Sequence, residues 1–219
     1  VGSAVVGIRS GDEVLAVAPH SLGAYTVTQA ELVVRKPPAL GFADAATLPI
    51  AYLTAYYALH TLGRIHRGER ILIHAAAGGV GLAAIHLALA AGAEIYATAG
   101  SPEKRAYLQQ LGIQNVLDSR SLDFADEVMA RTNGVGVDLV LNSLAGEVIP
   151  RSLALLRANG RFLEIGKRDI YGHSRLDMGL LKKNVAFFAI DLIPLLRAQP
   201  GLCREMLNEL MAMFATGAL

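Results

Sequence analysis

Residues 70–105 read RILIHAAAGGVGLAAIHLALAAGAEIYATAGSPEKR and follow the pattern of a strand, a glycine-rich turn, a helix and a second strand. Residues 71–74 form a short apolar run with β-branched members, which favours a strand buried on both faces. Residues 80–91 are rich in Ala and Leu and stop at Gly92, as a helix does. Residues 94–98 predict the next strand. The stretch therefore predicts one β-α-β unit of a parallel sheet.

The turn matches the pattern G-x-G-x-x-G with alanine in the first position, over Ala76, Ala77, Gly78, Gly79, Val80 and Gly81. A pyrophosphate needs backbone N–H groups aimed at it, and the first turn of a helix supplies several. A Cβ at Gly78 or Gly79 would obstruct the approach of a phosphate, and Gly81 lets the helix pack closely on the strand. We therefore expect the residues from Ala77 to Gly81 to bind a dinucleotide.

Two other interpretations of this stretch remain open. One is a glycine-rich turn of an α/β core that binds no ligand. The other is a membrane span, because no charged residue lies between Ile71 and Ala93, and about 20 residues suffice to cross a bilayer. The clustered glycines and the two histidines of the stretch argue against a span.

The composition of the 219 residues, with 53% apolar and 18% charged residues, is that of a globular chain with a sizeable core. A net charge of +1 gives no reason to expect nucleic acid or an anionic membrane as a partner. Cys203 is the single cysteine, so no internal disulfide can form. The start of the sequence lacks the pattern of a secretory signal. We expect a cytoplasmic protein.

The chain divides into three parts by its secondary-structure signals. Residues 1–37 predict short strands that cannot bury a core alone, which indicates the remnant of a β domain. Residues 38–192 alternate strands and helices and predict a doubly wound, parallel, six-stranded Rossmann sheet. Residues 193–219 predict a helix with one apolar stripe, leading back toward the β part. Both ends are expected to be cut from a larger polypeptide.

Some local features of the chain are less regular. Pro49 is expected to stop a short helical turn that begins at Phe42, with a new helix over residues 51–62. Residues 176–183 predict a short helix. Residues 25–27 predict one of the short strands of the β remnant.

The residues after the second strand indicate which dinucleotide binds. No acid stands at the strand's end to hold ribose hydroxyls, and Ser101, Lys104 and Arg105 follow within one helical turn. A 2′-phosphate favours a hydroxyl and cations at a helix N-terminus. We therefore expect NADPH, with Ser101 donating to the phosphate and Lys104 neutralising it. Lys104 and Arg105 point about 100° apart, so one of them faces the phosphate. Alternatively, both are solvated surface cations, and Glu103 can pair with either.

Several stretches together resemble the enoyl reductase domains of modular polyketide synthases and animal-type fatty acid synthases. These domains form a zinc-free branch of the medium-chain dehydrogenase/reductase superfamily, close to the quinone oxidoreductases. No cluster in the sequence has zinc-ligand spacing. The resemblance rests on GDEV (11–14), AATLPIAYLTAYYAL (45–59), RILIHAAAGGVGLAAIHLA (70–88), LNSLAGE (141–147) and RFLEIGKRDI (161–170).

The resemblance implies that NADPH reduces the double bond of an enoyl thioester carried on the phosphopantetheine of an acyl carrier protein. Hydride goes to the β-carbon and a proton then reaches the α-carbon. Residues 1–37 would belong to an incomplete GroES-like substrate domain. Lys167 and Asp191 match the family's proposed proton-donor positions: Lys167 would stabilise the enolate and donate, and Asp191 would hold Lys167 charged. Alternatively, the pair is a salt bridge at a domain junction.

Further cofactor contacts follow from the resemblance and from position. Thr54 is similar to the family's threonine beside the nicotinamide, and Arg120 to a contact near the adenosine. Asn142 and Ser143 close the fourth strand and would line the adenine end, and Gly166 lies at the same sheet edge. Their alternative roles are a packing threonine, a surface arginine and a polar turn.

Other functions fit the same fold. They are a free-standing NADPH:quinone oxidoreductase, a synthase domain that closes a ring instead of simply reducing, and a non-catalytic NADPH-binding module. The resemblance also implies the other domains of a synthase as partners. The apolar last strand, residues 185–190, would be a sticky sheet edge unless paired, so we expect a homodimer through it.

Overall fold

The computed structural model describes residues 1–219, which form two compact units. The first unit comprises Val1–Thr54 and Asp191–Leu219, and the second comprises Ala55–Ile190. The expected nucleotide domain began at residue 38, whereas residues 38–54 group with the first unit. No helix in the structure combines the length and the apolar character needed to cross a membrane.

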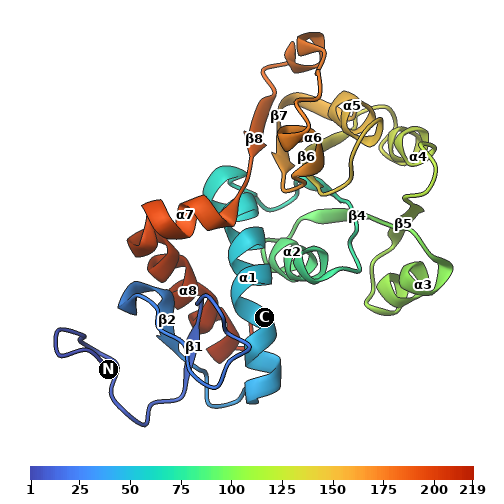
Figure 1. The fold of residues 1–219 in the computed structure, drawn as a ribbon. Helices are drawn as coiled ribbons and strands as arrows, with labels where there is room; N and C mark the ends of the chain where they lie inside the picture. Colours follow the sequence, from blue (N-terminus) through green and yellow to red (C-terminus); the bar gives the residue numbers. More distant parts are fainter. The chain divides into compact units, whose positions relative to one another are not determined.

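A six-stranded parallel sheet forms the centre of the second unit (Figure 1). The spatial order is β5-β4-β3-β6-β7-β8, so chain order reverses on either side of β3. Ile71 of β3 is in register with Ile95 of β4 and with Leu139 of β6. The predicted doubly wound sheet is confirmed. Its strands are β3 (Arg70–Ile73), β4 (Glu94–Ala99), β5 (Asn115–Asp118), β6 (Val137–Asn142), β7 (Leu156–Glu164) and β8 (Ala186–Ala189).

The sheet is stable because its strands are apolar on both faces. Leu72, Val140 and Phe162 are buried with residues of α4 and α5, and Phe162 stacks on Phe187 with 5.2 Å between ring centroids. Burying each such side chain contributes about 1.5–3 kcal/mol. The crossovers of the unit contain α2 (Gly79–Ala90), α3 (Pro102–Gln110), α4 (Phe124–Arg131), α5 (Val148–Ala154), α6 (Arg168–Tyr171) and the 3-10 helix η3 (Met178–Leu181).

The crossover between β7 and β8 differs from the prediction. Only the 3-10 helix η3 forms where residues 176–183 predicted an ordinary helix. Asp177 begins it by accepting a hydrogen bond from the Gly179 amide at 2.8 Å. A helix of one tight turn is what such a local side-chain bond favours.

The first unit contains a small antiparallel pair of strands, one 3-10 helix and three α-helices. Residues 25–27, predicted as a strand, form none: Tyr25 is exposed, and the Thr26 hydroxyl donates to the Pro19 carbonyl at 2.6 Å. The elements of the unit are β1 (Val14–Ala16), the 3-10 helix η1 (Ala30–Leu32), β2 (Val33–Arg35), α1 (Phe42–Tyr56), α7 (Leu192–Ala198) and α8 (Pro200–Ala215).

Helix α1 runs through Pro49, so the prediction that Pro49 stops a short turn was wrong. A proline inside a helix costs about 3 kcal/mol. Burial of Leu48 and Leu53 on either side of it, at about 1.5–3 kcal/mol each, offsets that cost. The last two residues of α1 already belong to the second unit, where the chain continues as the π-helix η2 (Tyr57–Leu62).

Helix α8 confirms the predicted apolar stripe near the end of the chain. Cys203, Met206, Leu207 and Leu210 are buried. The helix packs on β2, η1 and α7 of its own unit. Residues from both ends of the sequence therefore build the first unit.

Candidate functional site

The glycine turn lies at the carboxyl end of β3, between that strand and helix α2. Ala75 adopts a left-handed conformation with φ of 49°. The Ala76 amide donates to the Thr98 carbonyl at 2.9 Å, and the Gly78 amide donates to the Ala75 carbonyl at 2.9 Å. The first bond ties the turn to the neighbouring strand β4, and the second closes the turn on itself. Gly78 then leads into α2 with an extended backbone and without a side-chain cap.

The start of α2 has the features of a phosphate cradle. A Cβ on Gly81 would lie 2.6 Å from the Ala75 carbonyl oxygen and 2.6 Å from the Ala76 Cα, so only glycine fits there. The Leu82 amide makes the bond to the Gly78 carbonyl at 2.8 Å, and the amides of Gly79, Val80 and Gly81 precede it. Amides in this position have no partner within the helix. Gly78 and Gly79 are exposed, so an anion can reach them.

Ser101 caps helix α3 directly after β4. Its hydroxyl accepts a hydrogen bond from the Lys104 amide at 3.4 Å, and the Lys104 side chain is exposed. A hydrogen bond to Ser101 lowers the pKa of the exposed Glu103 carboxyl. The tip of β4 thus presents a hydroxyl, a helix N-terminus and an ammonium group, together with one carboxylate.

Two arginines lie at the same end of the sheet with different surroundings. The Arg105 guanidinium pairs with Asp118 at 2.9 Å and donates to the Ala99 carbonyl at 3.1 Å. The Arg120 Nε would lie 2.8 Å from a Cβ placed on Gly100. Arg120 therefore covers the backbone immediately before Ser101, while Arg105 is held by the ends of β4 and β5.

Asn142, Ser143 and Gly166 lie together at the carboxyl ends of β6 and β7. A Cβ on Gly166 would lie 3.4 Å from the Ser143 carbonyl oxygen, so these two segments pack backbone to backbone. The sheet order places β6 and β4 on opposite sides of β3. Asn142 and Ser143 are therefore on the other side of the glycine turn from Ser101.

Glu164 joins these two strand ends and was missed in the sequence analysis. It is 2% exposed and accepts hydrogen bonds from Asn142 Nδ2 and from the Gly166 amide, both at 2.6 Å. Burial raises its pKa to about 7, although both hydrogen bonds favour the charged form. The signal that was available is an acid at the end of an otherwise apolar strand, directly before Ile165 and Gly166.

The two expected catalytic residues belong to different units. Lys167 is exposed and precedes α6 in the second unit, one residue after Gly166. Asp191 begins the second segment of the first unit, where its carboxylate caps α7 by accepting from the Ile193 amide at 3.1 Å. Thr54 also belongs to the first unit, and its hydroxyl donates to the Ile50 carbonyl at 2.7 Å.

His74, directly before the glycine turn, is hydrogen-bonded to two other buried polar side chains, those of Thr98 and Ser152. His74 Nδ1 is 2.9 Å from the Thr98 hydroxyl, and Nε2 is 2.8 Å from the Ser152 hydroxyl. Burial lowers the pKa of His74 to about 3, so the imidazole is neutral at physiological pH. A neutral imidazole has one donor and one acceptor, which suits two hydroxyl neighbours. These hydrogen bonds link β3, β4 and α5 below the turn.

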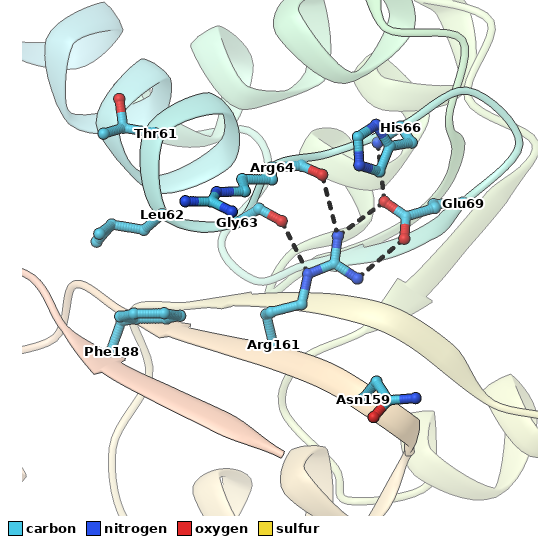
Figure 2. A pocket seen from close by; sticks show the side chains of 9 residues that line it. All are labelled: Thr61, Leu62, Gly63, Arg64, His66, Glu69, Asn159, Arg161 and Phe188. Carbon is cyan, nitrogen blue, oxygen red and sulfur yellow. Dashed lines mark hydrogen bonds and ion pairs between the residues drawn. The ribbon is translucent and has the colours of Figure 1, made fainter. Parts of the chain in front are cut away.

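A pocket of about 480 Å³ lies between the segment before β3 and the strands β7 and β8 (Figure 2). Arg161 lines this pocket, donates to the Gly63 carbonyl at 2.8 Å and pairs with the Glu69 carboxylate at 2.8 Å. Figure 2 shows these bonds converging on one guanidinium group. These bonds connect the loop before β3 to strand β7. Arg161 therefore has a structural role away from the glycine turn.

The fold and the turn define a class of protein. A parallel sheet in this order, with an uncapped glycine turn after its central strand, is a Rossmann-type dinucleotide-binding domain. A family profile described as "Zinc-binding dehydrogenase" matches residues 79–212.

Similar proteins narrow the class. The chain is 46% identical over 219 residues to a phenolphthiocerol/phthiocerol polyketide synthase of Mycobacterium tuberculosis, of which it spans 10%. The CurK enoyl reductase structure is 46% identical, with a TM-score of 0.88 over 100% of this chain and 65% of that one. The nucleotide-binding subdomain of the enoylreductase domain of PpsC from Mycobacterium tuberculosis is 48% identical, with a TM-score of 0.75 over 78% of this chain and 96% of that one.

The chain therefore belongs to the zinc-binding dehydrogenase family, and within it to the enoyl reductase domains of polyketide synthases. Relatives of this kind are parts of large multidomain synthases. A further neighbour, mycobacterial Rv1454c complexed with NADPH, is 26% identical with a TM-score of 0.87 over 100% of this chain and 69% of that one. These neighbours point to a nicotinamide cofactor. No group of three His, Cys, Asp or Glu side chains in the structure is placed to hold a metal ion.

Proposed function

We propose that this chain is the nucleotide-binding part of an NADPH-dependent enoyl reductase domain in a polyketide synthase. The reaction is the reduction of an enoyl thioester on an acyl carrier protein, with hydride added at the β-carbon and a proton at the α-carbon. The observation that carries the proposal is the uncapped glycine turn beside the exposed Lys104 at the tip of β4. The identity of 48% to a nucleotide-binding enoylreductase subdomain supports it.

The adenosine half of NADPH would bind along β3, β4 and β5. Within the turn from Ala77 to Gly81, the amides of Gly79, Val80 and Gly81 would hold the pyrophosphate, since they lie at the positive end of α2, whereas the Gly78 amide donates to Ala75. Ser101 and Lys104 would bind the 2′-phosphate, and Arg120 would contact the adenosine beside Gly100. Charge-assisted hydrogen bonds of this kind contribute about 1.5–3 kcal/mol each.

The nicotinamide half would bind on the other side of the turn. Asn142, Ser143 and Gly166 lie at the ends of β6 and β7, which the sheet order separates from β4. This position supports a role at the nicotinamide in place of the expected role at the adenine end. Thr54 stays assigned to the nicotinamide by the family resemblance.

Bound NADPH supplies the hydride. The residues of this chain would stabilise the negative charge that then develops on the thioester oxygen, because an isolated alkene resists hydride. The Lys167 ammonium would do so and would deliver its proton to the α-carbon, while Asp191 would keep Lys167 charged. A positioned general acid of this kind contributes about 10²–10⁴-fold to the rate.

The remaining assignments concern the rest of the protein. Residues 1–37 would belong to a GroES-like substrate domain, residues 38–192 to the nucleotide domain, and residues 193–219 to the return toward the substrate domain. Partners would be an acyl carrier protein and other synthase domains in the cytoplasm. A homodimer would form through β8, which is an edge of the sheet.

Stopped-flow measurement with the full-length protein tests this function. NADPH absorbance should fall on mixing with a crotonyl thioester and stay constant on mixing with a quinone. Turnover of the quinone alone would favour a quinone oxidoreductase. Binding of NADPH without turnover of either substrate would favour a non-catalytic module, and both results would reject the proposal.

A further inference from the structure

Glu164 is a buried acid at the candidate site that has no role in the reaction proposed above. Its carboxylate is 2% exposed, although an isolated buried carboxylate is costly. It lies at the carboxyl end of β7, two residues before Gly166 and three before Lys167. Both of its oxygens are engaged at 2.6 Å, one by the Gly166 amide and the other by Asn142 Nδ2.

Asn142 extends the bridge to the loop after β6. Its Nδ2 also donates to the Leu144 carbonyl at 2.7 Å, and its Oδ1 accepts from the Leu144 amide at 3.2 Å. One carboxylate therefore connects, directly or through Asn142, the two loops that leave β6 and β7. The loops also pack on each other, since a Cβ on Gly166 would lie 2.6 Å from Glu164 Oε1 and 3.4 Å from the Ser143 carbonyl oxygen.

We propose that Glu164 is a positioning residue of the reductase: by bridging Asn142 and the Gly166 amide, it fixes the backbone that carries Lys167 and the residues beside the nicotinamide. This inference rests on the proposed function. It predicts an effect on the chemical step, because a shift of about 1 Å in a reacting group can cost on the order of a hundredfold in rate.

The variant Glu164→Gln tests the bridge with little change of shape. Both partners of Glu164 are donors, whereas a glutamine offers one acceptor oxygen and one donor group. One of the two bonds must therefore be lost. Asp138→Asn is a matched control, because Asp138 is also a buried carboxylate of this sheet and also accepts from a backbone amide, that of Arg70 at 2.8 Å. It lies at the opposite, amino end of β6.

Two measurements on the full-length protein, both with folding checked by circular dichroism, decide the matter. At pH 8, where the Glu164 carboxylate is ionised, Glu164→Gln should lower kcat for a crotonyl thioester by about tenfold to a hundredfold, with KM and the NADPH dissociation constant within about threefold. Amide hydrogen exchange over residues 143–147 and 165–171 should become faster by on the order of tenfold. Asp138→Asn should change neither kcat nor exchange in these segments.

The outcomes separate this inference from the function on which it rests. If the wild-type protein cannot reduce the thioester, the proposed function is wrong. Amide hydrogen exchange alone then tests whether Glu164 holds the two loops together. Unchanged exchange, or faster exchange with unchanged kcat in an active enzyme, overturns the positioning role. If Glu164→Gln does not fold, Asn142→Ala replaces it: that variant keeps the Glu164–Gly166 bond, and exchange should rise over 143–147 with a smaller loss of kcat.

Discussion

The Arg105 guanidinium lies 2.9 Å from the Asp118 carboxylate and 3.1 Å from the Ala99 carbonyl, which holds it between the ends of β4 and β5. Lys104, one residue earlier, is exposed on the first turn of the same helix. The two adjacent cations therefore differ in their surroundings, since Arg105 is held by an ion pair and Lys104 is exposed. Arg105 stabilises the strand ends, and Lys104 is in position to meet an anion beside Ser101.

We expect Lys104→Glu to weaken NADPH binding by more than about tenfold and NADH binding by less than about threefold, because only NADPH brings a 2′-phosphate near residue 104. Fluorescence titration with both cofactors measures the ratio. Arg105→Ala is the control, which should lower stability and leave the ratio near that of the wild type. Equal losses for the two cofactors in Lys104→Glu would remove Lys104 from the phosphate site.

Gly81→Ala should weaken binding of both cofactors by at least about tenfold, because its Cβ would lie 2.6 Å from backbone atoms of Ala75 and Ala76. The turn would have to move to accommodate it. The matched control is Gly201→Ala in the first turn of α8, where a Cβ meets nothing within 4 Å. That control should be neutral or stabilising by up to about 1 kcal/mol. Calorimetric titration that finds unchanged affinity in Gly81→Ala would refute the cradle.

Lys167→Ala should slow the reduction of an enoyl thioester by about 10²–10⁴-fold while the NADPH dissociation constant stays within about threefold. The reason is that the ammonium acts on the substrate and not on the cofactor phosphates. Single-turnover kinetics separate the two effects. Lys182→Ala removes another exposed lysine of the same unit and should leave the reduction rate and the NADPH dissociation constant unchanged. A Lys167→Ala enzyme with a normal rate would assign proton delivery elsewhere.

The free energy of unfolding should depend on pH through the ionisation of Glu164. Its pKa is raised to about 7 from 4.5, so between these values the folded state holds a proton that the unfolded chain releases. The contribution of Glu164 to the free energy of unfolding therefore falls as pH rises through this window, by up to about 1.4 kcal/mol per pH unit. Asp169 strengthens the shift, and a cavity that Glu164 and Asp169 line is also lined by the charged residues Glu147, Arg175 and Asp177.

Urea denaturation of wild type and Glu164→Gln from pH 5 to pH 8 checks this expectation. The difference in free energy of unfolding should move in favour of the variant as pH rises. His74 is present in both proteins, so its own titration cancels from the difference. Parallel curves for the two proteins would mean that Glu164 ionises normally.

Much of the fold could be predicted from local signals along the chain. Residues 71–74 and 94–98 gave two central strands because apolar runs between glycines leave few alternatives in an α/β protein. The prediction at Pro49 was wrong because the free-energy cost of proline in a helix is local, whereas the burial of Leu48 and Leu53 that offsets it depends on the tertiary structure. Residues 25–27 have strand composition but find no partner strand in the structure.

The local geometry of the candidate site could be predicted where one segment forms it, and not where strands distant in sequence meet. The turn from Ala77 to Gly81 and the cap at Ser101 each arise within a few residues. Glu164 owes its position to Asn142, which lies on the neighbouring strand β6. The placement of Arg120 against Gly100 likewise depends on the pairing of β4 with β5, which residue spacing alone does not reveal.

The most direct test of the account is the ratio of NADPH to NADH affinity in the wild-type, full-length protein, measured by calorimetric titration. A glycine turn that holds the pyrophosphate and a basic tip of β4 that holds the 2′-phosphate predict NADPH binding tighter by on the order of a hundredfold. Equal affinity for the two cofactors, or binding of neither, would contradict the account.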